Sequence, residues 1–168
     1  MAASVDVTVS GLMLNFVGDI NAALREMRRV TRTGGTIAAY VWDYAGKMEP
    51  IRYFWDAAVE LDMEAARLDE GVRFVLCHPE TLGERFEGAG LSELDVTSLD
   101  ITALFEGFND YWDPFLGGQG PAPAYAISLK NDARERLRRR ILERLPTRRD
   151  GSIELTARAS AARGLVAE

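Results

Sequence analysis

Residues 26–43 read EMRRVTRTGGTIAAYVWD, and this stretch decides the fold class. It predicts the end of an amphipathic helix, a left-handed stop at Gly34-Gly35, and then a strand from Thr36 to Trp42. The strand is almost wholly apolar, which indicates cover on both faces. A helix that leads into such a strand is one crossover of a doubly wound α/β sheet. In these sheets ligands bind just past the carboxyl ends of the strands.

The residues before this stretch complete a strand–helix–strand unit. A β-branched run from Val5 to Ser10 predicts a strand, and Asp19 is a good N-cap for a helix that continues to Val30. Strand, helix and parallel strand imply a right-handed crossover. Two further helices are expected to begin at Pro50 and Pro79, because proline fits the first turn of a helix.

The second half of the chain changes in character. A strand is expected over residues 91–101, with a bulge or bend between Val96 and Leu99. Residues 105–125 are aromatic and then rich in Gly and Pro, which predicts a short helix and an ordered loop. An arginine-rich helix follows over residues 131–145, with Leu137, Ile141, Leu142 and Leu145 on its apolar side. Alternation from Ile153 to Ser160 predicts the last strand.

Composition limits the kind of protein. The 168 residues fit one domain, and 47% apolar and 27% charged residues are ordinary for a soluble globular protein. A net charge of −6 argues against a general nucleic-acid binder. One cysteine excludes an internal disulfide. Residues 1–16 lack the pattern of a signal peptide, and no apolar run reaches the ~20 residues of a membrane span. We therefore expect a cytoplasmic protein without a membrane partner.

The order of elements resembles the second half of a class I S-adenosylmethionine-dependent methyltransferase, of the methyltransferase type 11 kind. DVTVSGLMLNFVGD is similar to the fourth strand of that family and its loop. INAALREMRRVTRTGGTIAAYVWD is similar to the following helix and fifth strand, with Leu24, Glu26, Arg29 and Val30 in the recurring pattern and Thr33 where proline is usual. SIELTARASAARG resembles the closing antiparallel strand.

The resemblance implies an α/β, Rossmann-like methyltransferase sheet that lacks the first three strands. Residues 1–168 would form a single truncated domain, with residues 105–148 as a mainly helical, aromatic cap insert before an antiparallel last strand. The implied cofactor is S-adenosyl-L-methionine. The family holds it with a Gly-rich loop after the first strand, which cannot be placed in this chain. The cluster from Gly117 to Gly120 lies between aromatic and Pro-rich segments, outside the strand–loop–helix context that a nucleotide loop requires.

The missing strands would leave Val5 to Ser10 as an apolar edge. We expect this edge to be covered by a homodimer, by strand exchange or by a partner chain.

Six candidate site residues follow the two parallel strands. By resemblance, Ser10, Gly11 and Leu12 would contact the cofactor, and Gly11 allows close backbone approach. Asn15 would contact the substrate, with an ordinary loop as the alternative. Trp42 and Asp43 end the fifth strand of the resembled family and suit an organic substrate; packing and turn capping are the alternatives.

An aromatic stripe suggests a second group. Tyr111, Trp112 and Phe115, with Phe108, share one helical face and could form a lid over a flat or apolar substrate. Simple packing is the competing interpretation. Asp110 and Asp113 beside them could be acid–base groups or surface caps.

Other chemistry has less support. Adjacent Cys77 and His78 point to opposite sides of an extended chain, and with one residue of each type no transition-metal site is expected. The arginines of residues 134–149 could contact phosphate or form a solvated helix face.

Two functional hypotheses stay open. One is a methyltransferase-like protein that acts on a small organic acceptor, inactive alone for want of the glycine-rich loop. Such catalysis often depends on positioning, so no catalytic residue is named. The alternative is a non-enzymatic dimerisation or ligand-binding module; a hydrolase that uses Cys77 is a remote third.

Overall fold

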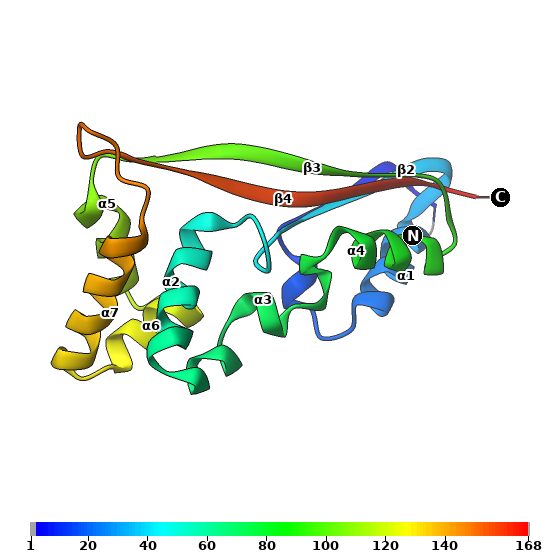
Figure 1. The fold of residues 1–168 in the computed structure, drawn as a ribbon. Coiled ribbons are helices and arrows are strands. Elements are labelled where there is room, and N and C mark those ends of the chain that lie inside the picture. Colours follow the sequence, from blue (N-terminus) through cyan, green and yellow to red (C-terminus); the bar gives the residue numbers. More distant parts are fainter. Residues whose placement is uncertain (1–2, 168) are drawn as a thin grey trace. The chain divides into compact units, whose positions relative to one another are not determined.

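The computed structural model describes residues 3–167 (Figure 1). Its helices and strands are, in chain order, β1 (Val5–Gly11), α1 (Ile20–Val30), β2 (Thr31–Trp42), α2 (Glu49–Leu61), α3 (Glu70–Arg73), α4 (Pro79–Gly88), β3 (Leu91–Phe105), α5 (Phe108–Trp112), α6 (Pro121–Ser128), α7 (Asn131–Arg144) and β4 (Ile153–Val166). Short 3-10 helices lie at Leu14–Phe16, Met63–Arg67, Val75–Cys77 and Asp113–Leu116.

One four-stranded sheet has the order β1-β2-β4-β3. β1 and β2 run parallel, as the crossover through α1 predicts, and β4 runs antiparallel to β2. The expected α/β sheet with an antiparallel last strand is therefore confirmed. β1 is an edge strand of the described sheet, with β2 on one side of it.

The chain divides into two compact units. The first contains residues 3–43, 74–99 and 158–167 of the described part, and the second contains residues 44–73 and 100–157. The proposed cap insert, residues 105–148, lies within the second unit, which also includes the helix that begins next to Pro50.

In the first unit, α1 and α4 pack on one face of the sheet (Figure 1). The side chain of Asp19 accepts a hydrogen bond from Ala22 N at 2.8 Å, which confirms the predicted N-cap. Side chains of β2 alternate, so that Ile37, Ala39 and Val41 are buried beneath these helices.

The opposite face of this sheet is exposed. Val7 and Val9 of β1 are 57% and 61% exposed, and Tyr40 of β2 is exposed on the same side. The prediction that β2 is covered on both faces is therefore wrong. An apolar run reports side-chain type, and it cannot tell a covered face from an uncovered one.

The predicted role of Gly34-Gly35 is also wrong. The helix ends at Val30, where Thr31 Oγ1 donates a hydrogen bond to Met27 O at 2.8 Å and the backbone of Thr31 is already extended. Gly34 does have a left-handed φ of 74°, but it lies within β2, where the register with β1 shifts. The glycine pair forms an irregularity in the strand and does not cap the helix.

The later elements are longer or more helical than expected. β3 continues to Phe105, and its left-handed residue is Glu93, at φ 49°, before the bend predicted between Val96 and Leu99. Residues 121–128, read from sequence as loop, form α6, because prolines in the first turn have no N–H that the helix needs. On α7, Leu142 is exposed, while the other three predicted core residues are buried.

The second unit has its own core of aromatic and aliphatic side chains. Phe54 on α2 is fully buried and stacks on Phe115 with ring centroids 4.6 Å apart. Residues of α5, α6, α7 and the start of β4 complete this core. Within residues 3–167, no helix combines the length and apolar character needed to cross a membrane.

Candidate functional site

The carboxyl end of β1 has unusual backbone geometry. A Cβ built on Gly11 would lie 2.5 Å from the hydroxyl of Tyr40, so the phenol occupies the place of a side chain at this position. Leu12 donates from its N–H to Tyr40 O at 2.8 Å and holds a left-handed φ of 59°. Left-handed backbone is uncommon outside glycine, and such strain often occurs at functional sites.

Asn15 lies in the 3-10 helix that follows. Its Oδ1 is buried, and among the described residues it has no hydrogen-bond partner. A buried acceptor without a partner costs about 1–3 kcal/mol, and it is a natural place for a ligand or a water molecule to donate.

Trp42 and Asp43 lie at the neighbouring strand end. β2 pairs with β1 in parallel, and Gly11 is opposite Tyr40, so the structure brings the end of β1 and residues 42–43 to the same edge of the sheet. Trp42 is half-buried on the same face as Tyr40. Asp43 is 8% exposed, and its N–H donates to Arg158 O at 2.9 Å.

The structure adds an aromatic pair that the sequence did not reveal. Phe16 and Phe74 meet edge to face with centroids 5.1 Å apart, and Phe16 is exposed. The two residues are far apart in sequence and neither belongs to a periodic pattern, so no sequence signal links them. Met13, also exposed, adds a second apolar side chain after β1.

The second unit holds the three predicted aromatic residues in its core. Tyr111, Trp112 and Phe115 are all buried, and Tyr111 Oη donates to Pro50 O at 2.8 Å. Burial raises the pKa of Tyr111 far above the ordinary value, which suits a neutral hydroxyl group fixed by packing. Their role in substrate binding stays a prediction; packing is what the contacts establish.

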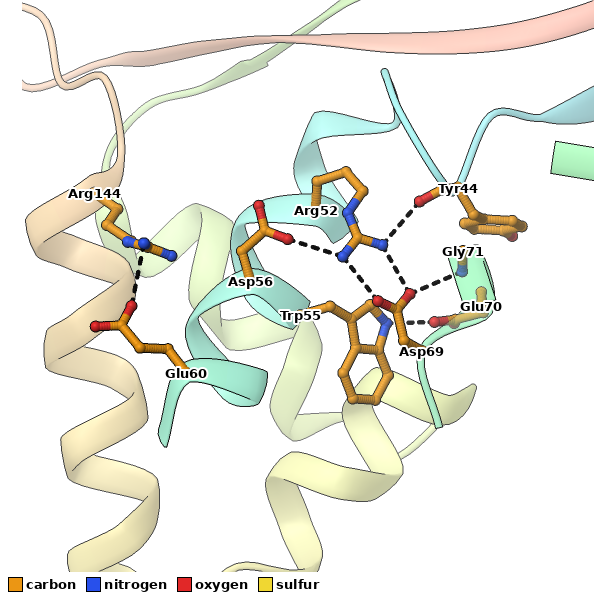
Figure 2. Close-up of polar contacts among 9 residues, drawn as sticks. All are labelled: Tyr44, Arg52, Trp55, Asp56, Glu60, Asp69, Glu70, Gly71 and Arg144. Atoms are coloured by element: carbon orange, nitrogen blue, oxygen red, sulfur yellow. Dashed lines mark hydrogen bonds and ion pairs between the residues drawn. The ribbon is translucent and has the colours of Figure 1, made fainter. Parts of the chain in front are cut away.

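A polar cluster follows β2 in the second unit, and the sequence analysis missed it (Figure 2). The guanidinium of Arg52 donates to both carboxylate oxygens of Asp69, at 2.7 and 2.8 Å. It also donates to Tyr44 O and to Asp56, both at 2.9 Å. Burial opposes the charge of Arg52, but the carboxylates outweigh it and raise the pKa of this side chain. The spacing of Arg52 and Asp56 suggests a helical pair, whereas nothing in the sequence marks Asp69 as a partner.

Glu70 is the second buried acid of this region. Trp55 Nε1 donates to its Oε2, and the carboxyl is largely removed from water. Burial raises the pKa of Glu70, against the opposing effects of its backbone hydrogen bond and of Trp55. A cavity of about 300 Å³ adjoins the cluster and is lined by Ala45, Gly46, Arg52, Asp56, Asp69, Gly71 and Val72.

Burial, turn capping or ion pairing accounts for the positions of the remaining candidate residues. Cys77 is buried, and His78 immediately precedes α4. Asp110 accepts from Glu106 N at 2.9 Å, as a turn cap does. Arg140 and Arg144 pair with Glu60 of α2 (Figure 2 shows Arg144). Among residues 3–167, no group of three or more His, Cys, Asp or Glu side chains could hold a metal ion.

Comparison with known proteins agrees with this geometry. The family model described as "Methyltransferase domain" matches residues 1–39, which contain β1, α1 and most of β2. The resemblance to class I methyltransferases is confirmed. No curated protein sequence matches the chain.

Solved structures with TM-scores above 0.5 show the same fold at low identity. A protein assigned as a type II methyltransferase from Anaeromyxobacter dehalogenans has a TM-score of 0.55 and 21% identity over 99% of this chain. One assigned as a methyltransferase from Bacillus halodurans has a TM-score of 0.54 and 10% identity, also over 99%. This chain covers 66% of each of those two chains. Phosphoethanolamine N-methyltransferase 2 of Haemonchus contortus, solved with S-adenosyl-L-methionine, has a TM-score of 0.48 and 11% identity; all of this chain and 34% of that one are covered.

S-adenosylmethionine is the cofactor that the resemblance implies. The strand-end residues offer one hydrogen-bond acceptor toward it, the partnerless Oδ1 of Asn15, whereas the phenol of Tyr40 covers Gly11. The glycines at 117–120 follow a 3-10 helix and precede α6, so they do not form a strand-to-helix loop for the nucleoside.

Proposed function

We propose that this chain carries the acceptor-binding side of an S-adenosylmethionine-dependent methyltransferase that acts on a small organic molecule. The proposal is supported by one observation above all. Two parallel strands of a methyltransferase fold end at the same edge of the sheet. The loop after the first of them contains Asn15, whose Oδ1 is a hydrogen-bond acceptor without a partner in the described structure.

Each residue of the site has a simple role. The ligand lies against the loop that follows Gly11, where the phenol of Tyr40 covers the glycine, and Asn15 accepts a hydrogen bond from the ligand. Trp42 provides an apolar surface for the molecule that receives the methyl group, and Asp43 provides an acidic group. The cofactor, when bound, supplies an electrophilic methyl group, and the protein need only hold the acceptor in line with it.

Calorimetric titration with S-adenosylmethionine and S-adenosylhomocysteine tests this proposal. We expect binding tighter than millimolar, and no methyl transfer by the 168-residue chain alone, because its sequence has no strand-linked glycine-rich loop. Asn15→Leu should weaken binding about five- to tenfold, the equivalent of one lost hydrogen bond. Asn21→Leu, an exposed asparagine outside this loop, should leave the affinity unchanged. No binding by the native chain would refute the proposal.

A second function, a dimerisation module, is favoured by the uncovered edge of β1. Antiparallel pairing of two β1 strands about Thr8 would set Val7 opposite Val9 of the second copy and Asp6 opposite Ser10. The strand is therefore self-complementary, as a two-fold interface requires, and no like charges meet.

Light scattering across a concentration series tests the dimer. We expect a dimer at micromolar concentration, and a monomer for Val9→Lys, because lysine blocks edge pairing and this side chain is exposed. A native chain that stays monomeric would contradict the module. We also propose a cytoplasmic location, which fractionation of cells would test.

A further inference from the structure

A second cavity lies in the first unit, and none of its lining residues belongs to the strand-end site. It has a volume of about 470 Å³ and is lined by Asn21, Arg25, Arg28, Glu84, Arg85, Gly88, Ala89 and Gly90. These residues come from α1, from α4 and from the turn after α4. The volume is within the range of small-molecule sites, which is about 300–1,000 Å³.

The lining of this cavity is basic, although the protein as a whole is acidic. Three arginines and one glutamate line it, in a chain whose net charge is −6. On α1, Asn21, Arg25 and Arg28 share one face because they are four and three residues apart. Arg85 of α4 adds the third guanidinium to the same cavity.

Two of these arginines are positioned by neighbours that leave donors available. Arg28 Nη1 donates to Ala89 O at 3.2 Å, and a Cβ built on Gly90 would lie 2.8 Å from the same nitrogen. Gly90, at φ 73°, thus gives Arg28 room to lie against the turn. Arg85 Nη1 donates to Asn21 Oδ1 at 3.4 Å. A guanidinium has five N–H donors, and each of these contacts uses one.

Arg25 is the least neutralised of the three. Its contact with Asp19 is long, at 3.9 Å, and both side chains are more than 60% exposed. An exposed pair of this kind contributes little energy and yields readily to a stronger acceptor. Planar guanidinium groups bind phosphate oxygens in a bidentate manner, and such charge-assisted bonds are the strong ones.

We propose that this cavity binds a small molecule through a phosphate group, independently of methyl transfer. Arg25 of α1 and Arg85 of α4 approach the phosphate, and Arg28 of α1 supports it with a guanidinium held against the turn. Gly88, where a Cβ would meet nothing within 4 Å, leaves room for the rest of the ligand.

The test uses inorganic phosphate and pyrophosphate as probes, with chloride at equal ionic strength as the reference, in calorimetry and in NMR of the arginine Nε–Hε groups. We expect saturable binding, tighter for pyrophosphate, with shifts confined to the cavity arginines. Arg25→Gln and Arg85→Gln should each weaken binding about tenfold, which corresponds to one charge-assisted hydrogen bond.

Arg32→Gln is the matched control, because it removes the same charge from an exposed pair with Asp6 in the same unit. It should leave phosphate binding unchanged. Circular dichroism verifies that each variant is folded. The proposal is overturned if phosphate and pyrophosphate fail to saturate, or if Arg32→Gln weakens binding as much as Arg25→Gln. Measurement of S-adenosylmethionine binding by the same variants separates this site from the strand-end site, since its affinity should not change.

Discussion

Both units expose some apolar side chains, but the aromatic core of the second unit and the strand β1 of the first differ in burial. The second unit buries its aromatic side chains: Phe54 is fully buried and Phe115 nearly so, and the two rings stack. The first unit covers one face of its sheet and leaves Val7 and Val9 in solvent on the other. The aromatic stripe of the sequence therefore lies in a core, whereas the β-branched strand β1 has an exposed apolar face.

The largest expected effect tests this contrast directly. Phe54→Ala should lower the free energy of unfolding by about 3–5 kcal/mol, because it removes a fully buried ring and leaves a cavity. Val9→Ala, in dilute protein, should change it by no more than about 0.5 kcal/mol, since that side chain is exposed. Urea denaturation measures both. Similar losses for the two variants would show that the face of β1 is covered in solution.

The Arg52–Asp69 pair should come next. The side chains of Arg52 and Asp69 are 15% and 5% exposed, so Asp69→Ala removes the buried partner, leaves Arg52 with Tyr44 O and the exposed Asp56, and should cost about 3 kcal/mol. Asp56→Ala removes the exposed partner of the same guanidinium and should cost less than about 1 kcal/mol. Equal costs from thermal or urea unfolding would mean that the pair is solvated.

A glycine in the same cluster should give a smaller loss. A Cβ on Gly71 would lie 2.7 Å from Tyr44 O and from Arg52 Nη1, so Gly71→Ala should destabilise the protein by about 1–3 kcal/mol. Gly88→Ala is the control, because a Cβ at Gly88 meets no atom within 4 Å and alanine favours the helix. Its stability should be unchanged or higher by up to about 1 kcal/mol. A Gly71→Ala variant as stable as Gly88→Ala would contradict the tight approach of these segments.

The smallest effect concerns pH. Because burial raises the pKa of Glu70 in the folded state, this group binds its proton more readily when folded. Its contribution to stability is present in full below the unfolded value of 4.5, and it is lost as the pH rises through the folded pKa. The slope should not exceed about 1.4 kcal/mol per pH unit, and Glu70→Gln should remove it. Urea unfolding of both proteins across this range provides the measurement; identical pH profiles would refute the assignment.

Local patterns predicted much of the fold. The β-branched run at the start of β1, the cap at Asp19, and the prolines at 50 and 79 placed their elements because each acts on its own neighbours. The parallel strand ends could be predicted for the same reason, since two adjacent strands and one crossover determine them.

The failures arose where distant residues decide the outcome. Gly34-Gly35 resembles a helix cap, but the interaction of Thr31 with Met27 ends the helix first, and Gly35 then lies against Asp6 O of the neighbouring strand. The pairs Arg52–Asp69 and Phe16–Phe74 join separate segments, and a sequence without its relatives carries no sign of such pairs.

The division of the chain between the units has a consequence for its evolution. The first unit is assembled from three separate stretches of the chain. The second unit therefore consists of the two segments that connect those stretches, residues 44–73 and 100–157. The entropic cost of closing a loop rises only with the logarithm of its length, by roughly 0.6 kcal/mol per doubling. Insertions and deletions in the second unit should therefore cost the first unit little. We expect the helices of the second unit to tolerate changes in length, while β1 and β2 still end at the same edge of the sheet.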